Sequence, residues 1–146
     1  MTQSDISFKE VNESDSKFLY DLLKNRDPIT NISHKKMPTF KEHKVFLNSH
    51  PYTKWYIILF KKRKVGSIYL SKQDEIGIFI NKEFQSKEIG TKSLNLLMKK
   101  IPRKRYLANV SPQNKNSQKF FKNNDFKLIQ YTYELIPKIE DNEKSN

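Results

Sequence analysis

The sequence has no cysteine in its 146 residues and only three glycines. Without cysteine the chain has no disulfide, no thiolate metal ligand and no cysteine nucleophile. No apolar run approaches the roughly 18 residues that a membrane-spanning helix needs. The N-terminus, MTQSDISFKEV, lacks the charged start and the apolar middle of a signal peptide. These absences lead us to expect a cytoplasmic protein without a membrane span.

Positive charge is in excess, with 28 Lys and Arg against 16 Asp and Glu, a formal net charge of +12. Such a charge favours anionic partners, namely nucleic acid, a membrane surface or phosphorylated small molecules. The chain is also rich in Lys, Asn and Ile, a bias that AT-rich coding DNA explains equally well. Charge alone therefore does not choose the partner.

Hydrophobic patterning predicts a single mixed α/β domain in the order β-α-α-β-β-β-α-β-α-β. The domain is expected to span residues 1–136, and residues 137–146 are expected to form a polar, disordered tail. The predicted strands are 5–11, two strands within 54–71, 75–80, 104–110 and 125–136. The predicted helices are 12–26, 39–50, 90–101 and 112–124.

The segment TFKEHKVFLNSH places Thr39 three residues before Glu42, the spacing of a capping box, so a helix is expected to begin there. Its expected buried face is Phe40, Val45 and Phe46. The segment DFKLIQYTYELI alternates apolar and polar residues, which predicts the final strand.

In the stretch FINKEFQSKEIGTKSLNLLMKK, an apolar strand ends at Ile80 and Gly90 lies at the start of a basic amphipathic helix. The N-terminus of a helix offers unpaired N–H groups and a partial positive charge, which suit a phosphate. Glycine allows a tight turn and a close approach of an anion to the backbone. A lone glycine here is more often an ordinary turn residue, so the arrangement alone leaves both readings open.

Two sequence motifs support the hypothesis that this helix start binds a phosphate. The run QSKEIG, from Gln85 to Gly90, is similar to the pyrophosphate loop Gln/Arg-x-x-Gly-x-Gly/Ala. The run from Asn114 through Ser117 and Phe121 to Phe126 is similar to Asn-x-x-Ala/Ser-x-x-x-Tyr-x-x-x-Gly-Phe. With these motifs in this order of elements, residues 5–135 resemble the GNAT-superfamily N-acetyltransferases. The resemblance implies the GNAT fold and transfer of an acetyl group from acetyl-CoA to a primary amine.

The resemblance also implies which residues bind acetyl-CoA. The amides of residues 85–91 would surround the pyrophosphate, Asn114 would bond the pantetheine arm, and an N–H of Phe79 or Ile80 would stabilise the thioester oxygen. The implied cofactor-binding set is Ile78, Phe79, Ile80, Gln85, Ser86, Lys87, Glu88, Ile89, Gly90, Thr91, Asn114, Ser117 and Phe121.

The chain departs from the family pattern at three of these motif positions. Glu88 replaces the first glycine of the loop, and Asp125 replaces the glycine before Phe126. Asp tolerates a left-handed backbone better than most residues do. Phe121 stands where many members carry a tyrosine that protonates the leaving thiolate, and phenylalanine cannot donate that proton.

Acetyl transfer requires a neutral amine, and alkyl ammonium groups have pKa values near ~10, so a base is useful. Glu75, at the start of a strand, is the first candidate, with a solvated strand-end carboxylate as the alternative. Asn109, at the end of the next strand, would line the same site, with ordinary turn capping as the alternative. His43 is a second candidate base or acceptor ligand, with a packing role as its alternative. The histidines do not have metal-ligand spacing, so no metal site is expected.

The stretches NISHKKMPTFKEHKVFL, KWYIIL and KVGSIYL are similar to GNAT enzymes that acetylate amino groups on nucleotide-linked sugars. The alternatives are an acetyltransferase for protein N-termini or other small amines, and a non-catalytic domain that binds CoA or nucleic acid. Aromatic residues at core periods disfavour a single-strand nucleic-acid groove. Both a monomer and a homodimer fit the sequence.

Overall fold

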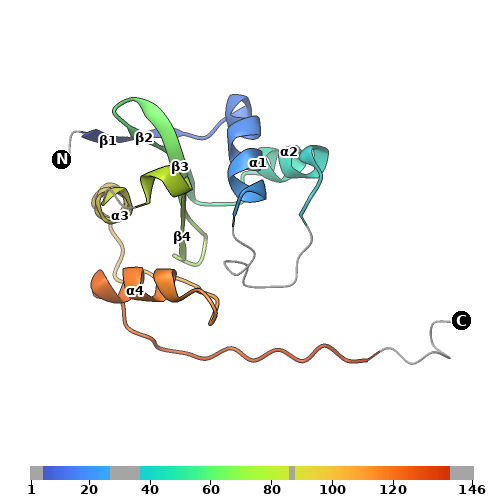
Figure 1. Ribbon diagram of the computed structural model, residues 1–146, viewed down its shortest axis with the longest axis vertical. Helices are drawn as coiled ribbons and strands as arrows, with labels where there is room; N and C mark the ends of the chain where they lie inside the picture. Colours follow the sequence, from blue (N-terminus) through green and yellow to red (C-terminus); the bar gives the residue numbers. More distant parts are fainter. Residues whose placement is uncertain (1–4, 27–36, 86–87, 139–146) are drawn as a thin grey trace, which may run out of the picture.

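The computed structural model describes residues 5–26, 37–85 and 88–138, and its described strands form an antiparallel sheet of four in the order β1-β2-β3-β4 (Figure 1). The strands are β1 Ile6–Glu10, β2 Lys54–Phe60, β3 Arg63–Leu70 and β4 Ile76–Ile80. The helices are α1 Ser16–Lys24, α2 Phe40–Asn48, α3 Ile89–Lys100 and α4 Lys115–Asn123, with short 3-10 helices η2 Glu13–Asp15 and η4 Lys82–Phe84. The predicted mixed α/β class is confirmed.

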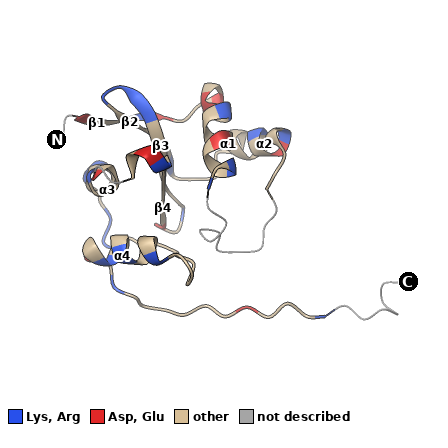
Figure 2. Cartoon of the chain, in the orientation of Figure 1, with Lys and Arg blue, Asp and Glu red and all other residues tan. Residues whose placement is uncertain are grey.

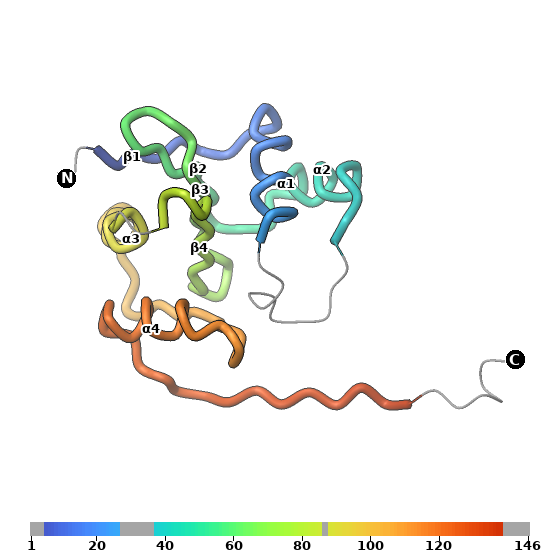
Figure 3. The backbone as a smooth tube through the Cα atoms, in the orientation of Figure 1, coloured from blue at the N-terminus to red at the C-terminus, as the bar shows by residue number. Residues whose placement is uncertain are grey.

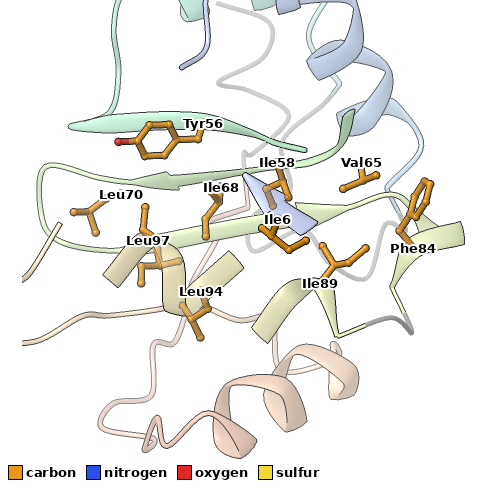
Figure 4. Close-up of a cluster of buried hydrophobic side chains, with 11 residues drawn as sticks. Ile6, Tyr56, Ile58, Val65, Ile68, Leu70, Phe84, Ile89, Leu94 and Leu97 are labelled. Atoms are coloured by element: carbon orange, nitrogen blue, oxygen red, sulfur yellow. The ribbon is translucent and has the colours of Figure 1, made fainter. Parts of the chain in front are cut away.

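One face of the sheet forms the larger core, against α3. Strand residues alternate between the two faces, so Ile58, Ile68 and Ile76 project to the same side. There they meet Leu94 and Leu97 of α3, and all of these side chains are buried (Figure 4). The amphipathic helix expected to start at Gly90 is confirmed as α3, with its apolar side on the sheet.

The opposite face of the sheet is covered by α1 and α2. Leu19 of α1 and Leu47 of α2 pack on Ile57 of β2, with Trp55 at the margin. Beside this cluster, the carboxylate of Asp15 is completely buried and accepts hydrogen bonds from Lys9 Nζ at 2.6 Å and Lys64 Nζ at 2.7 Å. This ion-pair network ties β1 and β3 to the start of α1.

The predicted capping box of α2 is confirmed, because Thr39 and Glu42 exchange side chain to backbone hydrogen bonds. The predicted buried face is wrong. His43 and Leu47, four residues apart, point inward, while the following residues are exposed: Phe40, Val45 and Phe46. Phe46 packs edge-on against the rings of Tyr52 and Trp55 at the rim of the core, which leaves much of it in water.

The strand predicted at 104–110 is reduced to one parallel bridge between Leu107 and Glu75. Ile76 N donates to Leu107 O at 2.7 Å, and Leu107 N donates to Asp74 O at 2.9 Å. The hydroxyl of Tyr106 donates to Ile101 O at 2.6 Å, which holds the start of this segment against the end of α3. These contacts limit the pairing with β4 to the neighbourhood of Leu107.

The final predicted strand, 125–136, does not join the sheet. Asp125 has a φ of 70°, and beyond it the chain runs extended below α4, outside the body of the domain (Figure 1). Every residue from 127 to 138 is exposed. A β-strand requires a neighbouring strand, and no described strand pairs with this segment.

Among the described helices, none is both long and apolar enough to cross a bilayer. No group of three or more potential metal-ligating side chains occurs in residues 5–26, 37–85 and 88–138. The predicted tail from residue 139 onward lies outside the described residues.

Candidate active site

The peptide groups of β4 are paired to β3 on one side and open on the other beyond Ile76. Ser71 N donates to Glu75 O at 2.8 Å, and Asn81 N donates to Val65 O at 2.9 Å. In an antiparallel ladder every second residue bonds to the neighbouring strand, so these two bonds fix the phase. The N–H of Phe79 therefore faces β3, whereas those of Ile78 and Ile80 face away from it.

Because of this alternation, the two N–H groups that were predicted to bond the thioester oxygen face opposite sides of β4. The N–H of Ile80 lies on the open edge of β4, and that of Phe79 does not. The N–H of Ile78 lies on the same open edge, two residues closer to the bridge at Leu107. The term open edge of β4 refers below to the peptide groups of Ile78 and Ile80 that face away from β3.

The predicted pyrophosphate loop connects this edge to α3. Gln85 Nε2 donates to Ile80 O at 2.8 Å, which fixes the start of the loop. Ser86 and Lys87 lie outside the described residues. Glu88 has φ 61° and ψ 11°, and its side chain makes no capping hydrogen bond to α3. The side chain thus leaves the first amides of α3 available, as an anion site at a helix N-terminus requires.

Gly90 occupies the predicted helix start, but the reason for a glycine differs from the one expected. Its φ is not positive, so the left-handed turn belongs to Glu88. A Cβ on Gly90 would lie 2.9 Å from Cε1 of Phe120, closer than such atoms approach. Gly90 therefore permits α4 to pack closely against the first turn of α3, while Ile89 beside it is buried in the core and Thr91 is half-buried.

The second motif forms the start and the end of α4. Asn114 Oδ1 accepts a hydrogen bond from Ser117 N at 3.1 Å, so Asn114 caps the helix through its oxygen and keeps its amide nitrogen for another partner. The ring of Phe121 packs edge-on against Phe120 and Phe126, with both centroid distances 5.1 Å. Phe121 is thus part of an aromatic cluster.

Glu75 and Asn109, predicted separately, are brought together by the bridge at Leu107. Glu75 Oε2 accepts a hydrogen bond from Asn109 Nδ2 at 2.8 Å, and Oε1 accepts one from Ser71 Oγ at 3.2 Å. Two neutral donors therefore hold a half-buried carboxylate in a fixed orientation at the start of β4. Each donor orients one of the two carboxylate oxygens.

His43 is not brought into this group. It is buried between α1 and α2, where its ring meets Tyr20 edge-on at 5.6 Å. Its Nδ1 is buried without a hydrogen-bond partner among the described residues, and burial lowers its pKa from the ordinary 6.5. These contacts agree with the packing alternative for His43.

Sequence analysis missed an aromatic face beside Glu75. Glu75, Gly77 and Phe79 share one face of the sheet because strand residues alternate. The ring of Tyr69 lies on Gly77, in the space that a Cβ would need, and stacks on Tyr52 with a centroid distance of 3.8 Å. The signal in the sequence was Gly77 itself, because a glycine inside a strand often marks a close approach.

Electrostatically, this aromatic face combines a cation with two neutral phenols. The guanidinium carbon of Arg26 lies 4.5 Å from the ring centroid of Phe79. Burial raises the pKa of Tyr52 well above its ordinary range, and burial also raises that of Tyr69. Both hydroxyls therefore remain hydrogen-bonding groups near neutral pH.

The sequence profile of the Acetyltransferase (GNAT) family matches residues 17–126, more than half of the chain. The chain belongs to the GNAT family of acetyltransferases. A search of curated proteins found no match.

Solved structures share the GNAT fold of this chain. A domain from Methanocaldococcus jannaschii is 26% identical, with a TM-score of 0.76 over 88% of this chain and 92% of that one. An acetyltransferase from Thermus thermophilus is 16% identical, with a TM-score of 0.71 over 89% and 92%. RimL, a ribosomal L7/L12 α-N-protein acetyltransferase in complex with coenzyme A, is 20% identical, with a TM-score of 0.67 over 87% and 82%.

As a GNAT acetyltransferase, the protein uses acetyl-CoA as the acetyl donor. The described residues fit this donor in two independent places. The N–H groups of Ile78 and Ile80, which face away from β3, suit an amide-bearing arm, and the uncapped first turn of α3 after Glu88 suits a phosphate.

Proposed function

We propose that this protein acetylates a primary amine and that Glu75 accepts the proton of that amine. The observation that carries the proposal is the carboxylate of Glu75, held by Asn109 and Ser71 beside the open edge of β4. An alkyl amine is mostly protonated at neutral pH, and a positioned carboxylate can remove its proton directly or through one water. Acetyl-CoA supplies the activated acetyl group.

The same geometry supports the remaining proposed roles. The N–H groups of Ile78 and Ile80 would bind the pantetheine arm and stabilise charge on the thioester oxygen. The first turn of α3 would bind the pyrophosphate, and the amide nitrogen of Asn114 would donate to the arm. Asn109 acts as a positioning residue, because it orients Glu75 through a hydrogen bond.

For the acceptor, we propose the amino group of a nucleotide-linked sugar. The net charge of +12 and the Arg26 cation over the ring of Phe79, which shares a sheet face with Glu75, both favour an anionic acceptor. The same charges oppose a polyamine such as the substrate of the spermidine N-acetyltransferase SpeG from Vibrio cholerae, a structural neighbour. Lys and Arg are spread over the helices and the β2–β3 turn (Figure 2), which disfavours the nucleic-acid-binding alternative.

A second candidate acceptor is a protein N-terminus. The structural neighbour from Salmonella typhimurium modifies the N-terminal serine of ribosomal protein L7/L12, and it shares the fold at a TM-score of 0.66 and 18% identity. An acceptor screen with acetyl-CoA should therefore compare amino-sugar nucleotides, N-terminal peptides and spermidine. If only the peptide is acetylated, the acceptor is a protein N-terminus and not a nucleotide-linked sugar. A cytoplasmic location stays a prediction.

The role of Glu75 is tested by Glu75→Gln, which keeps the shape and removes the base. We expect kcat to fall about 10²–10⁴-fold, because a positioned base contributes that much, while binding of acetyl-CoA is unchanged. Glu83→Gln is the matched control, since Glu83 is an exposed carboxylate in η4. Equal pH–rate profiles and equal maximal rates for the parent and Glu75→Gln would exclude Glu75 as the base.

A further inference from the structure

The segment after α4 presents an apolar surface that its own domain does not cover. The exposed fractions of its large side chains lie between 64% and 90%. These residues are Leu128, Ile129, Tyr131, Tyr133, Leu135 and Ile136. Contiguous exposed apolar residues on an extended strand usually mark a surface that another chain covers.

The backbone of this segment is also unpaired. From Lys127 to Tyr133, no backbone group hydrogen-bonds to another described residue, and the preceding bond runs from Phe126 N to Phe121 O at 2.9 Å. An extended chain in this state offers a row of donors and acceptors to a neighbouring strand.

A matching surface lies at the edge of the sheet, beside the bridge at Leu107. Leu107 bonds to β4, but the backbone groups of Ala108, Asn109 and Val110 make no hydrogen bond to any described residue. Ala108 and Val110 are half-buried, so these peptide groups lie partly within the protein surface. Residues 108–110 form a receiving edge that lacks a strand.

The geometry of α4 directs the segment away from this edge in its own domain. After the left-handed turn at Asp125, the chain runs out past the body of the domain (Figure 3). Residues 127–136 span about 33 Å when extended, which is long enough to reach a neighbouring molecule. Between 127 and 136 the only charged residues are Lys127 and Glu134, so this part of a basic chain can approach a second copy without charge repulsion.

We propose that residues 127–136 of one copy pair as a β-strand with the receiving edge 108–110 of a second copy. The exchange is reciprocal, so each copy gives one strand and accepts one, and the assembly closes as a two-fold dimer. Leu107 turns both of its peptide groups toward β4, so alternation turns those of Ala108 and Val110 to the outer side, where the added strand can bond to them. The pairing also covers the apolar side chains of the segment. It also places the partner's strand beside Asn109.

The test uses the full chain, with mass measured by analytical ultracentrifugation and amide protection by hydrogen exchange. We expect a dimer in which the amides of Ala108 and Val110 and alternate amides within 127–136 are both protected. Thr132→Pro removes a donor in the middle of the strand, where proline is not tolerated, and should give a folded monomer in which both segments lose protection. Thr132→Ser is the matched control and should remain dimeric.

Thr132 is exposed in the described chain, so its replacement by proline should leave the core intact, and circular dichroism checks this. A monomeric parent with both segments protected would mean that the strand folds back on its own domain, which overturns the exchange. A dimer that survives Thr132→Pro would place the interface elsewhere. If 127–136 is protected and 108–110 is not, the strand pairs at another place, which overturns the proposed exchange.

Discussion

Glu88 and Asp125 both hold left-handed backbone conformations, with φ values of 61° and 70°. They are the two positions at which the chain replaces a glycine of the family motifs. A non-glycine residue in this conformation costs roughly 1–2 kcal/mol, because Cβ approaches the neighbouring carbonyl oxygen. The fold has therefore kept the backbone shape of the glycines without the residue that adopts it most easily.

At the residue scale, Glu88→Gly should not weaken CoA binding and should tighten it. The substitution removes a carboxylate from the loop and supplies the residue that prefers a positive φ. Glu88→Gln is the matched control, since it removes the charge and keeps the backbone cost. Isothermal titration with CoA would measure both variants, and a clear loss of affinity in Glu88→Gly would show that the Glu88 side chain contacts the ligand.

At the scale of elements, the contact between α3 and α4 depends on Gly90 and Phe120. The missing Cβ of Gly90 gives room to the ring of Phe120, and this ring in turn packs on Phe121. Overpacking such a contact typically costs about 1–3 kcal/mol. The same glycine lies in the first turn of α3, so packing and phosphate binding have to be separated by experiment.

We expect Gly90→Val to lower the free energy of unfolding by about 1–3 kcal/mol, because the new side chain meets the Phe120 ring. In a Phe120→Leu background the same substitution should cost less, and the double-mutant cycle measures the coupling. Urea unfolding gives these energies. Equal costs in both backgrounds would show that Phe120 is not what excludes a side chain at position 90.

At the scale of the whole molecule, two buried titratable groups link stability to pH. Burial alone would raise the pKa of Asp15, but the hydrogen bonds from Lys64, Lys9 and the Asn12 amide outweigh it and lower that pKa below 3.8. Its stabilisation is thus present above pH 3.8 and is lost only as the pH falls through the folded pKa. His43 acts in a higher window, because burial lowers its pKa below 6.5.

We expect the free energy of unfolding to fall as the pH drops from about 7.5 to about 5.5, because unfolded His43 binds a proton that the folded form resists. His43→Phe should flatten this dependence while keeping an aromatic ring against Tyr20. Urea unfolding at several pH values measures the slope, and an imidazole NMR titration of the parent gives the pKa directly. An unchanged slope in His43→Phe would assign the pH dependence to other groups.

Hydrophobic period and capping signals were sufficient for most elements. The amphipathic pattern after Gly90 predicted α3, and Thr39 with Glu42 predicted the start of α2. The buried face of α2 was wrong because a short helix with apolar residues on several sides does not show which side meets the sheet. Packing of His43 and Leu47 decided it.

The sequence by itself determined the family and the mixed α/β class, because these depend on local period and on residues at fixed spacing. Only the tertiary structure decided which side chains and peptide groups lie next to one another. The bridge at Leu107 joins Asn109 to Glu75, the phase of β4 exposes the N–H of Ile80 rather than that of Phe79, and Arg26 reaches Phe79 across the fold. Strand pairing is a non-local property, so the alternation of residues 125–136 predicted a strand but could not supply its partner.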